Sequence, residues 1–162
     1  MNSGQSAPQV EEEKCRTLFF HSGGEVFALA ISSVEEIVVT RDWTPVPLAP
    51  SSVVGVVNHR GEIYTIVNFA RLTGIGNDGE GEVAVFLHRR EMSVGIAVQS
   101  IDGIEWVPRR LLEQSAAPGG EGEPGFLQGI LDFGGKMANV IDPEKLADTI
   151  ARLPEPAGAQ DG

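Results

Sequence analysis

Few side chains in this sequence could carry out chemistry, and they lie far apart. The one cysteine is Cys15, and the three histidines are His21, His59 and His88. A catalytic nucleophile needs a base and an orienting group within hydrogen-bonding reach, and zinc needs several closely spaced His or Cys ligands. The sequence shows neither pattern, and Cys15 at the edge of a polar N-terminal stretch is expected to be an ordinary thiol. We therefore predict no catalytic residue and no metal site.

Two glycine-rich segments could in principle hold a phosphate. Gly74-Ile75-Gly76 lacks the strand–loop–helix context and the downstream lysine of a phosphate loop. Gly134-Gly135 lies between two apolar segments and predicts a hairpin turn. No cofactor site is expected.

Two charged residues suggest protein binding instead. Glu36 lies between Val34 and Ile37 in a short apolar segment, and Arg60 sits in a tight turn before Gly61. The planar guanidinium matches a carboxylate, and arginine is enriched in binding hot spots. One interpretation is that Glu36 and Arg60 pair at a partner-binding groove. The other is that Glu36 is a solvated carboxylate at a strand edge and Arg60 a generic turn arginine.

Composition narrows the possible partners. The 162 residues are 41% hydrophobic, and 23 acidic against 12 basic residues give a net charge of −11. Such an acidic surface repels phosphate backbones and anionic lipids, so we expect no nucleic acid partner and no direct membrane insertion. No apolar run approaches the about 20 residues of a membrane span. A single cysteine fits the reducing cytoplasm, where we expect the protein to be.

Short β-rich segments separated by Gly and Pro must position these residues. We read residues 1–14 and 154–162 as disordered tails around a domain at 15–153. Asp142 and Pro143 suit the start of a C-terminal helix that ends near Arg152. The predicted strands are residues 16–21, 25–31, 34–39, 53–58, 63–68, 83–88, 93–98, 101–107, 127–132 and 137–141.

The sequence also repeats itself. A shift of 67 places Phe19 on Phe86, and a shift of 74 places Gly55 on Gly129. An insertion near residues 115–125 accounts for the difference, and residues 77–82 form an acidic linker. Each half, roughly 16–76 and 82–152, then carries five strands that can close into a small barrel, with the halves intertwined at the core. The alternative is a chance match of apolar patterns.

The segment from Val54 to Ile63 resembles the CheW family, whose pattern is an apolar strand, Asn-Leu-Arg-Gly and a second apolar strand. Val34-Glu35-Glu36-Ile37 and Val140-Ile141-Asp142-Pro143 are similar to other family segments. The resemblance covers about residues 16–152. It implies an all-β fold of two five-stranded SH3-like barrels with short helical segments.

The resemblance also implies a non-catalytic adaptor in chemotaxis. Such adaptors bind the cytoplasmic tip of a chemoreceptor (a methyl-accepting chemotaxis protein) and the CheW-like regulatory domain of a CheA-type histidine kinase, and they are recruited to receptor arrays. The partner-binding residues that it implies lie in the two segments quoted above. They are Val34, Glu36, Ile37, Val57, Asn58, His59, Arg60 and Gly61.

Several positions depart from the family pattern. His59 replaces a leucine, Tyr64-Thr65 stands where Val-Pro is common, and Asn68-Phe69-Ala70 stands where Asp-Leu-Arg is common. A divergent paralogue of a non-standard system such as surface motility, binding only receptor or only kinase, is therefore an alternative. A small enzyme that uses a cleft between the barrels is a further one, and it would need convergent titratable groups in a pocket.

Overall fold

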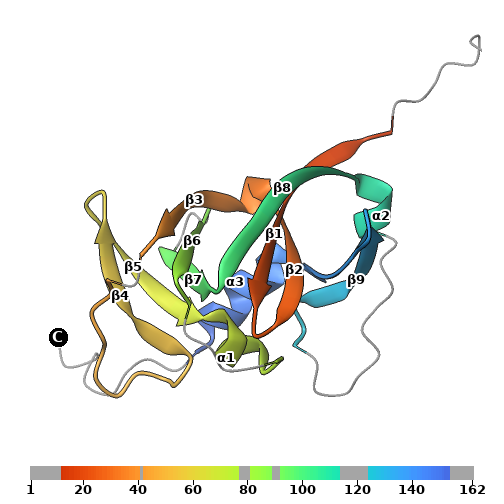
Figure 1. Cartoon of the computed structure of the whole chain (residues 1–162). Coiled ribbons are helices and arrows are strands. Elements are labelled where there is room, and N and C mark those ends of the chain that lie inside the picture. Colours follow the sequence, from red (N-terminus) through yellow and green to blue (C-terminus); the bar gives the residue numbers. More distant parts are fainter. Residues whose placement is uncertain (1–11, 41, 77–80, 89–91, 114–123, 154–162) are drawn as a thin grey trace, which may run out of the picture.

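The computed structural model describes residues 12–40, 42–76, 81–88, 92–113 and 124–153, most of them in short strands (Figure 1). Residues 1–11 of the predicted N-terminal tail and all of the predicted C-terminal tail at 154–162 lie outside these ranges, as does most of the two predicted connecting segments. The strands are β1 (Lys14–Ser22), β2 (Glu25–Ala30), β3 (Val34–Val39), β4 (Val53–His59), β5 (Glu62–Asn68), β6 (Val83–Leu87), β7 (Val94–Val98), β8 (Ser100–Pro108), β9 (Leu127–Phe133) and β10 (Lys136–Ile141). The helices are α1 (Phe69–Thr73), α2 (Arg109–Glu113) and α3 (Pro143–Ala151).

The strands form two five-stranded sheets, and each sheet takes strands from both halves of the chain. The first sheet has the order β8-β1-β2-β10-β9, and the second has the order β3-β6-β7-β5-β4. β3, β4 and β5 of the first half therefore share a sheet with β6 and β7 of the second half. In the same way, β8, β9 and β10 of the second half share a sheet with β1 and β2 of the first half. This corrects the expectation that each half closes on itself, because a repeated sequence is equally compatible with pairing within and between its copies.

Backbone irregularities follow the same repeat. The register between β1 and β8 shifts at Asp102, and that between β3 and β6 shifts at Glu35, which is 67 residues earlier (102 − 35). The β9–β10 hairpin shifts at Gln128, and the β4–β5 hairpin shifts at Val54, which is 74 residues earlier (128 − 54). A chance match of apolar patterns does not explain bulges at equivalent positions.

Three apolar clusters hold the sheets together. The largest, here called the inter-barrel layer, lies between the sheets and receives Leu18 and Phe20 from β1 and Val85 from β6. The neighbouring side chains Phe19 and Phe86 face the opposite way, each into the small core of its own barrel. All five side chains are almost completely buried. Strands that are buried on both faces appear as continuous hydrophobic runs, as these do in the sequence.

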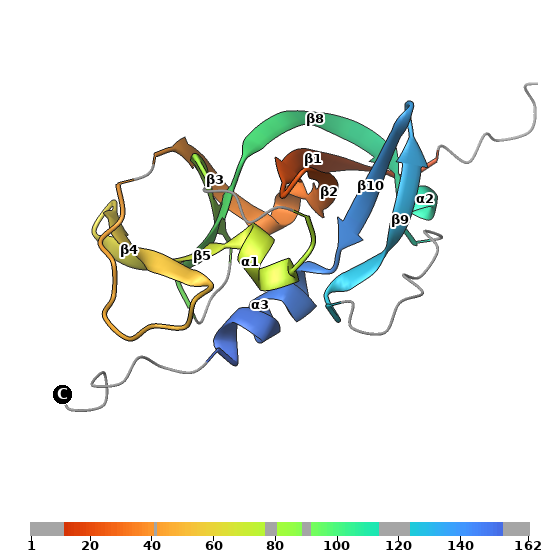
Figure 2. The same ribbon diagram turned by 60° about the horizontal axis from the view of Figure 1, so that its bottom comes forward.

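The two helices that cover the inter-barrel layer begin at equivalent positions (Figure 2). The side chain of Asn68 accepts a hydrogen bond from the backbone N–H of Arg71, and that of Asp142 accepts one from the N–H of Glu144. Asn68 and Asp142 are 74 residues apart (142 − 68). The cap at Asp142 is confirmed, whereas a helix as short as α1 left no periodicity to predict it. None of the helices in the described ranges is long and apolar enough to cross a membrane.

The start of the chain also differs from expectation. β1 begins at Lys14, so the predicted tail is too long at its end. Cys15 lies half-buried within this strand, paired with Val107 of β8, and not at the edge of a tail. Arg109 and Arg110 of α2 form ion pairs with Glu13 and Glu12, which fasten the beginning of β1.

Truncation of Phe69 should destabilise both sheets together. Its ring packs against those of Phe20 and Phe27, with centroids 5.3 and 4.8 Å apart, in the layer that both sheets share. We expect Phe69→Ala to lower the free energy of unfolding by about 3–5 kcal/mol in a single cooperative transition, measured by urea denaturation. The control Met137→Ala, at an exposed side chain, should change it by less than about 0.5 kcal/mol. Two separate transitions would contradict the shared layer.

Candidate protein-binding site

The tight turn that carries Arg60 holds this side chain out in solvent. Arg60 and Gly61 are the two central residues of the β4–β5 hairpin, and both have positive φ, 54° and 83°. The side chain of Asn58 accepts a hydrogen bond from the N–H of Gly61 at 3.1 Å. The equivalent turn between β9 and β10 has Gly134 and Gly135 in the same region. An arginine therefore occupies a left-handed position that its repeat gives to glycine, and its side chain is 76% exposed.

Glu36 of β3 reaches across to this turn. The Nε2 atom of His59 lies 2.9 Å from Oε1 of Glu36, within hydrogen-bonding distance. The Nη2 atom of Arg60 lies 3.4 Å from each carboxylate oxygen of Glu36. β3 and β4 are at opposite ends of the strand order in the second sheet, so these side chains join the two edges and close the barrel.

A second contact links β3 to the β4–β5 hairpin. The hydroxyl of Tyr64 in β5 donates a hydrogen bond to Oε1 of Glu35 at 2.9 Å. The bulge at Glu35 allows both consecutive carboxylates to meet the hairpin, although side chains normally alternate along a strand. We call Glu35, Glu36, His59, Arg60 and Tyr64 the polar seam.

Aromatic packing fixes the rings of the polar seam from inside the barrel. His59 stacks on Phe86 with centroids 4.7 Å apart, and Tyr64 packs on the same ring at 4.5 Å. His59 and Tyr64 both depart from the CheW family pattern. They share Phe86 as a neighbour, and they bind the adjacent carboxylates of Glu36 and Glu35.

The electrostatics of the polar seam follow from these contacts. The hydrogen bond with His59 lowers the pKa of Glu36, and the charge of Arg60 lowers it further against the opposing effect of desolvation. Burial and the hydrogen bond to Glu35 raise the pKa of Tyr64 to about 12, so the hydroxyl stays a donor. His59 lies closer to the Glu36 carboxylate than Arg60 does, and only the Nη2 atom of Arg60 approaches that carboxylate. A guanidinium has five N–H donors, so Arg60 can also bind another acceptor.

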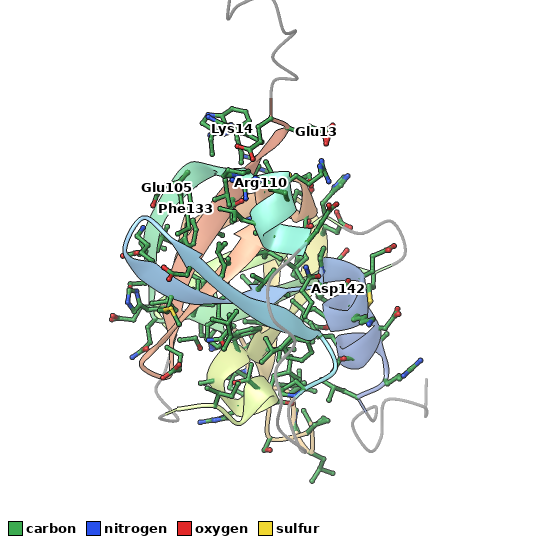
Figure 3. The ribbon with its side chains drawn as sticks, turned by 90° about the vertical axis from the view of Figure 1, so that its right-hand side faces the viewer. Glu13, Lys14, Glu105, Arg110, Phe133 and Asp142 are labelled. Carbon is green, nitrogen blue, oxygen red and sulfur yellow. The ribbon has the colours of Figure 1, made fainter. Side chains whose placement is uncertain are left out.

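The first barrel closes in a related way. Lys136 of β10 forms an ion pair with Asp102 of β8 at 3.2 Å, and its amino group also binds Glu105. The hydrogen bond to Glu105 is the main cause that raises the pKa of Lys136. Figure 3 shows Glu105 and the hairpin residue Phe133 on the same side of this barrel. In both barrels, side chains therefore link the first strand in the sheet order to the hairpin at the other end, where no backbone hydrogen bonds close the sheet.

An apolar groove lies where the second sheet meets the end of α3. Its volume is about 330 Å³. Val94 and Ile150 in its wall also belong to the inter-barrel layer, so the groove opens onto that layer. The groove is lined by Val46, Pro50, Val53, Val56, Thr65, Met92, Val94, Ile150, Ala151 and Leu153.

The structure separates the predicted binding residues into three groups. Glu36, His59 and Arg60 come together in the polar seam, and Asn58 and Gly61 build its turn. Val57 packs against the core of the second barrel, and Val34 and Ile37 pack against the inter-barrel layer. The residues that line the apolar groove were missed, because they come from several separate segments with no common pattern.

A family model described as the CheW-like domain matches residues 16–151 of this chain. The chain belongs to this family. The chemotaxis protein CheW of Thermotoga maritima is 25% identical over 134 residues, which cover 82% of this chain and 87% of that protein. The chemotaxis protein CheW of Rhizobium meliloti is 29% identical over 128 residues, which cover 76% and 81%.

The crystal structure of the scaffolding protein TtCheW from Thermoanaerobacter tengcongensis has a similar fold. It matches with a TM-score of 0.69 at 22% identity and covers 80% of this chain and 89% of that one. The predicted all-β fold of two five-stranded SH3-like barrels with short helices is confirmed. The chain is a CheW-like adaptor of the chemotaxis type.

The departures from the CheW pattern lie mostly inside the molecule. Tyr64, Asn68 and Ala70 are 3%, 2% and 6% exposed. Asn68 caps α1 and Ala70 lies within that helix, so these two residues serve local structure.

Removal of the Glu36 carboxylate should change how stability depends on pH. The pKa of Glu36 in the folded protein lies below the usual value of 4.5, so the charged form stabilises the fold above that pH, and this contribution is lost as pH falls through the folded pKa. We expect Glu36→Gln to be less stable than the parent at pH 6 and the difference to shrink towards pH 3. Urea titrations at several pH values measure it, with Glu25→Gln at an exposed position as the control for net charge. A difference that is constant with pH would contradict this role of the polar seam.

Proposed function

We propose that this protein is a non-catalytic, cytoplasmic adaptor that binds the cytoplasmic tip of a chemoreceptor and the regulatory domain of a histidine kinase. The observation that carries the proposal is the placement of Arg60. It extends from a left-handed turn at one end of β4, while Val53 and Val56 of the same strand line the apolar groove.

This combination suits a helical partner. An amphipathic helix can place its apolar face in a groove of Val, Ile and Leu side chains and offer a carboxylate to a nearby arginine. The tip of a chemoreceptor is a helical hairpin and supplies such a surface. Receptor binding at β4 would recruit the adaptor to receptor arrays.

The kinase surface is assigned from exposed apolar side chains that repeat. Trp106 and Met137 of the first barrel are 59% and 63% exposed, and Val39 and Ile63 at the equivalent positions of the second barrel are 82% and 56% exposed. Tryptophan is enriched in binding hot spots, and its exposure in the free protein leaves this side chain available to a partner. The kinase domain, itself CheW-like, would dock on such a barrel end, and Trp106 is the larger anchor.

Coupling then needs no chemistry. The inter-barrel layer joins both barrels into one body, so two interfaces on this body fix the geometry of receptor and kinase relative to each other. A change in one bound partner biases the other through a coupling free energy.

Removal of the Arg60 side chain tests the receptor site. Arg60→Gly deletes the guanidinium and gives the left-handed turn its preferred residue, so the fold should be retained or stabilised. We expect receptor binding to fall about tenfold or more, measured by calorimetry with a receptor hairpin fragment. The matched control is Arg110→Gly in α2, outside the site. Unchanged binding of Arg60→Gly would show that the groove and turn are wrongly assigned.

Replacement of Trp106 tests the kinase site separately. Trp106→Ser should weaken binding of the kinase regulatory domain about tenfold and leave receptor binding unchanged, because the residue lies in the other barrel. Val39→Ser makes the equivalent change in the second barrel and distinguishes the two barrel ends. If the parent protein binds only one of the two partners, the adaptor role is replaced by that of a single-partner paralogue.

A further inference from the structure

His59 and Arg60 share one acceptor in the polar seam, and they share it unequally. Nε2 of His59 lies 2.9 Å from Oε1 of Glu36, whereas Nη2 of Arg60 lies 3.4 Å from each oxygen of that carboxylate. Hydrogen bonds between a guanidinium and a carboxylate are normally about 2.7–2.9 Å long. The carboxylate of Glu36 is therefore held towards His59 and away from the distance that Arg60 would prefer.

The imidazole of His59 is the better fixed of the two donors. Its ring stacks on Phe86 at an interplanar angle of 25° and lies edge-on to Tyr64, with centroids 6.2 Å apart. The side chain of His59 is 22% exposed, against 76% for that of Arg60. Exposed side chains exchange rotamers freely, so Arg60 can turn either to Glu36 or to solvent.

Loss of the imidazole would change this balance. Because Glu36 only accepts hydrogen bonds, a neutral His59 must carry its proton on Nε2 to make the contact. Without that donor, both oxygens of Glu36 are open to Arg60, whose planar guanidinium matches a carboxylate. Donors that Arg60 commits to Glu36 are then lost to a carboxylate on a partner.

Protonation of His59 would release Arg60 further. Histidine is the side chain whose charge ordinarily changes between pH 5 and 8. Glu36 stays ionised in that range, because the hydrogen bond with His59 holds its pKa below 4.5. An imidazolium would compensate the charge of Glu36 and repel the guanidinium, so the attraction that draws Arg60 inwards weakens as pH falls.

Several other groups face His59 from the elements packed around it. The strand β6 contributes the uncharged ring of Phe86. Carboxylates and arginine keep their charge between pH 6 and 8, and the pKa of Tyr64 is raised to about 12, so its hydroxyl stays neutral. The charged and titratable groups around His59 are Glu35 and Glu36 of β3, Arg60 of the turn, and Glu62 and Tyr64 of β5.

We propose that His59 is a positioning residue of the receptor site, which holds Glu36 away from Arg60 so that the guanidinium can bind a carboxylate of the partner, and that protonation of His59 increases this release. The inference rests on the proposed receptor-binding role of Arg60. It adds a second residue to that role and a dependence on pH. The leucine of the CheW pattern at this position has neither the donor nor the charge to act in this way.

The first test uses the free full-length protein. NMR measures rotation about the Cζ–Nε bond of the Arg60 guanidinium, which slows when the group is held in an ion pair. At pH 8 we expect slower rotation in His59→Leu than in the parent, because Arg60 then pairs with Glu36. His59→Gln, whose amide can donate to Glu36 in place of Nε2, should not show this slowing. Equal rates in the parent and His59→Leu would overturn the inference.

The second test measures affinity for a receptor hairpin fragment by calorimetry. At pH 8, His59→Leu should bind about threefold more weakly than the parent, and addition of Glu36→Gln to it should recover this loss. A merely structural role of His59 predicts no recovery when a second polar side chain is removed. From pH 8 to pH 6, binding by the parent should strengthen about threefold relative to His59→Gln. The matched control is His88→Gln, at an exposed histidine outside the site, which should keep the pH response of the parent.

The outcomes distinguish this inference from the proposed function. If Arg60→Gly retains binding, the receptor site and the positioning role both fail. If Arg60→Gly loses binding but the double variant stays as weak as His59→Leu, the positioning role is wrong and the receptor site stands. An equal pH response in the parent and His59→Gln would overturn the part assigned to protonation.

Discussion

The apolar layer between the two barrels is the constraint on which the rest of the structure depends. Strands such as β1 are buried on both faces, with Leu18 and Phe20 in the layer and Phe19 in a barrel core. Because each sheet contains strands of both halves, neither barrel can form from one half alone. This exchange makes the molecule one mechanical unit. For an adaptor such unity matters, since coupling between two partners requires that a displacement at one interface reaches the other.

Closure of the small sheets creates the second constraint. Five strands leave edges whose remaining gap is bridged by side chains, Glu36 with His59 in one barrel and Asp102 with Lys136 in the other. The first of these seams also belongs to the proposed binding site. Since His59 engages Glu36 more closely than Arg60 does, the structural requirement for closure and the requirement for an exposed cation are both met at one turn.

Local strain is concentrated around one strand. Leu48 and Arg60 hold left-handed conformations before and after β4, whereas the equivalent hairpin turn of the first barrel uses Gly134. Each such residue costs on the order of 1–3 kcal/mol, and glycine would relieve most of it. Backbone strain of this kind is often found at functional sites, where stability is given up for activity or binding.

The sequence by itself determined the strands, the repeat and the capped C-terminal helix, and it singled out Glu36 and Arg60 without deciding whether they form a pair. These features depend on local periodicity, turn residues and spacing, which a single chain displays directly. The exchange of strands, the contact between Tyr64 and Glu35, and the apolar groove were decided only by the tertiary structure. Each brings together residues from distant segments, and a repeat leaves open which copy a strand pairs with. The free energy that selects the pairing comes from burial of the inter-barrel layer, and this is a property of the whole fold.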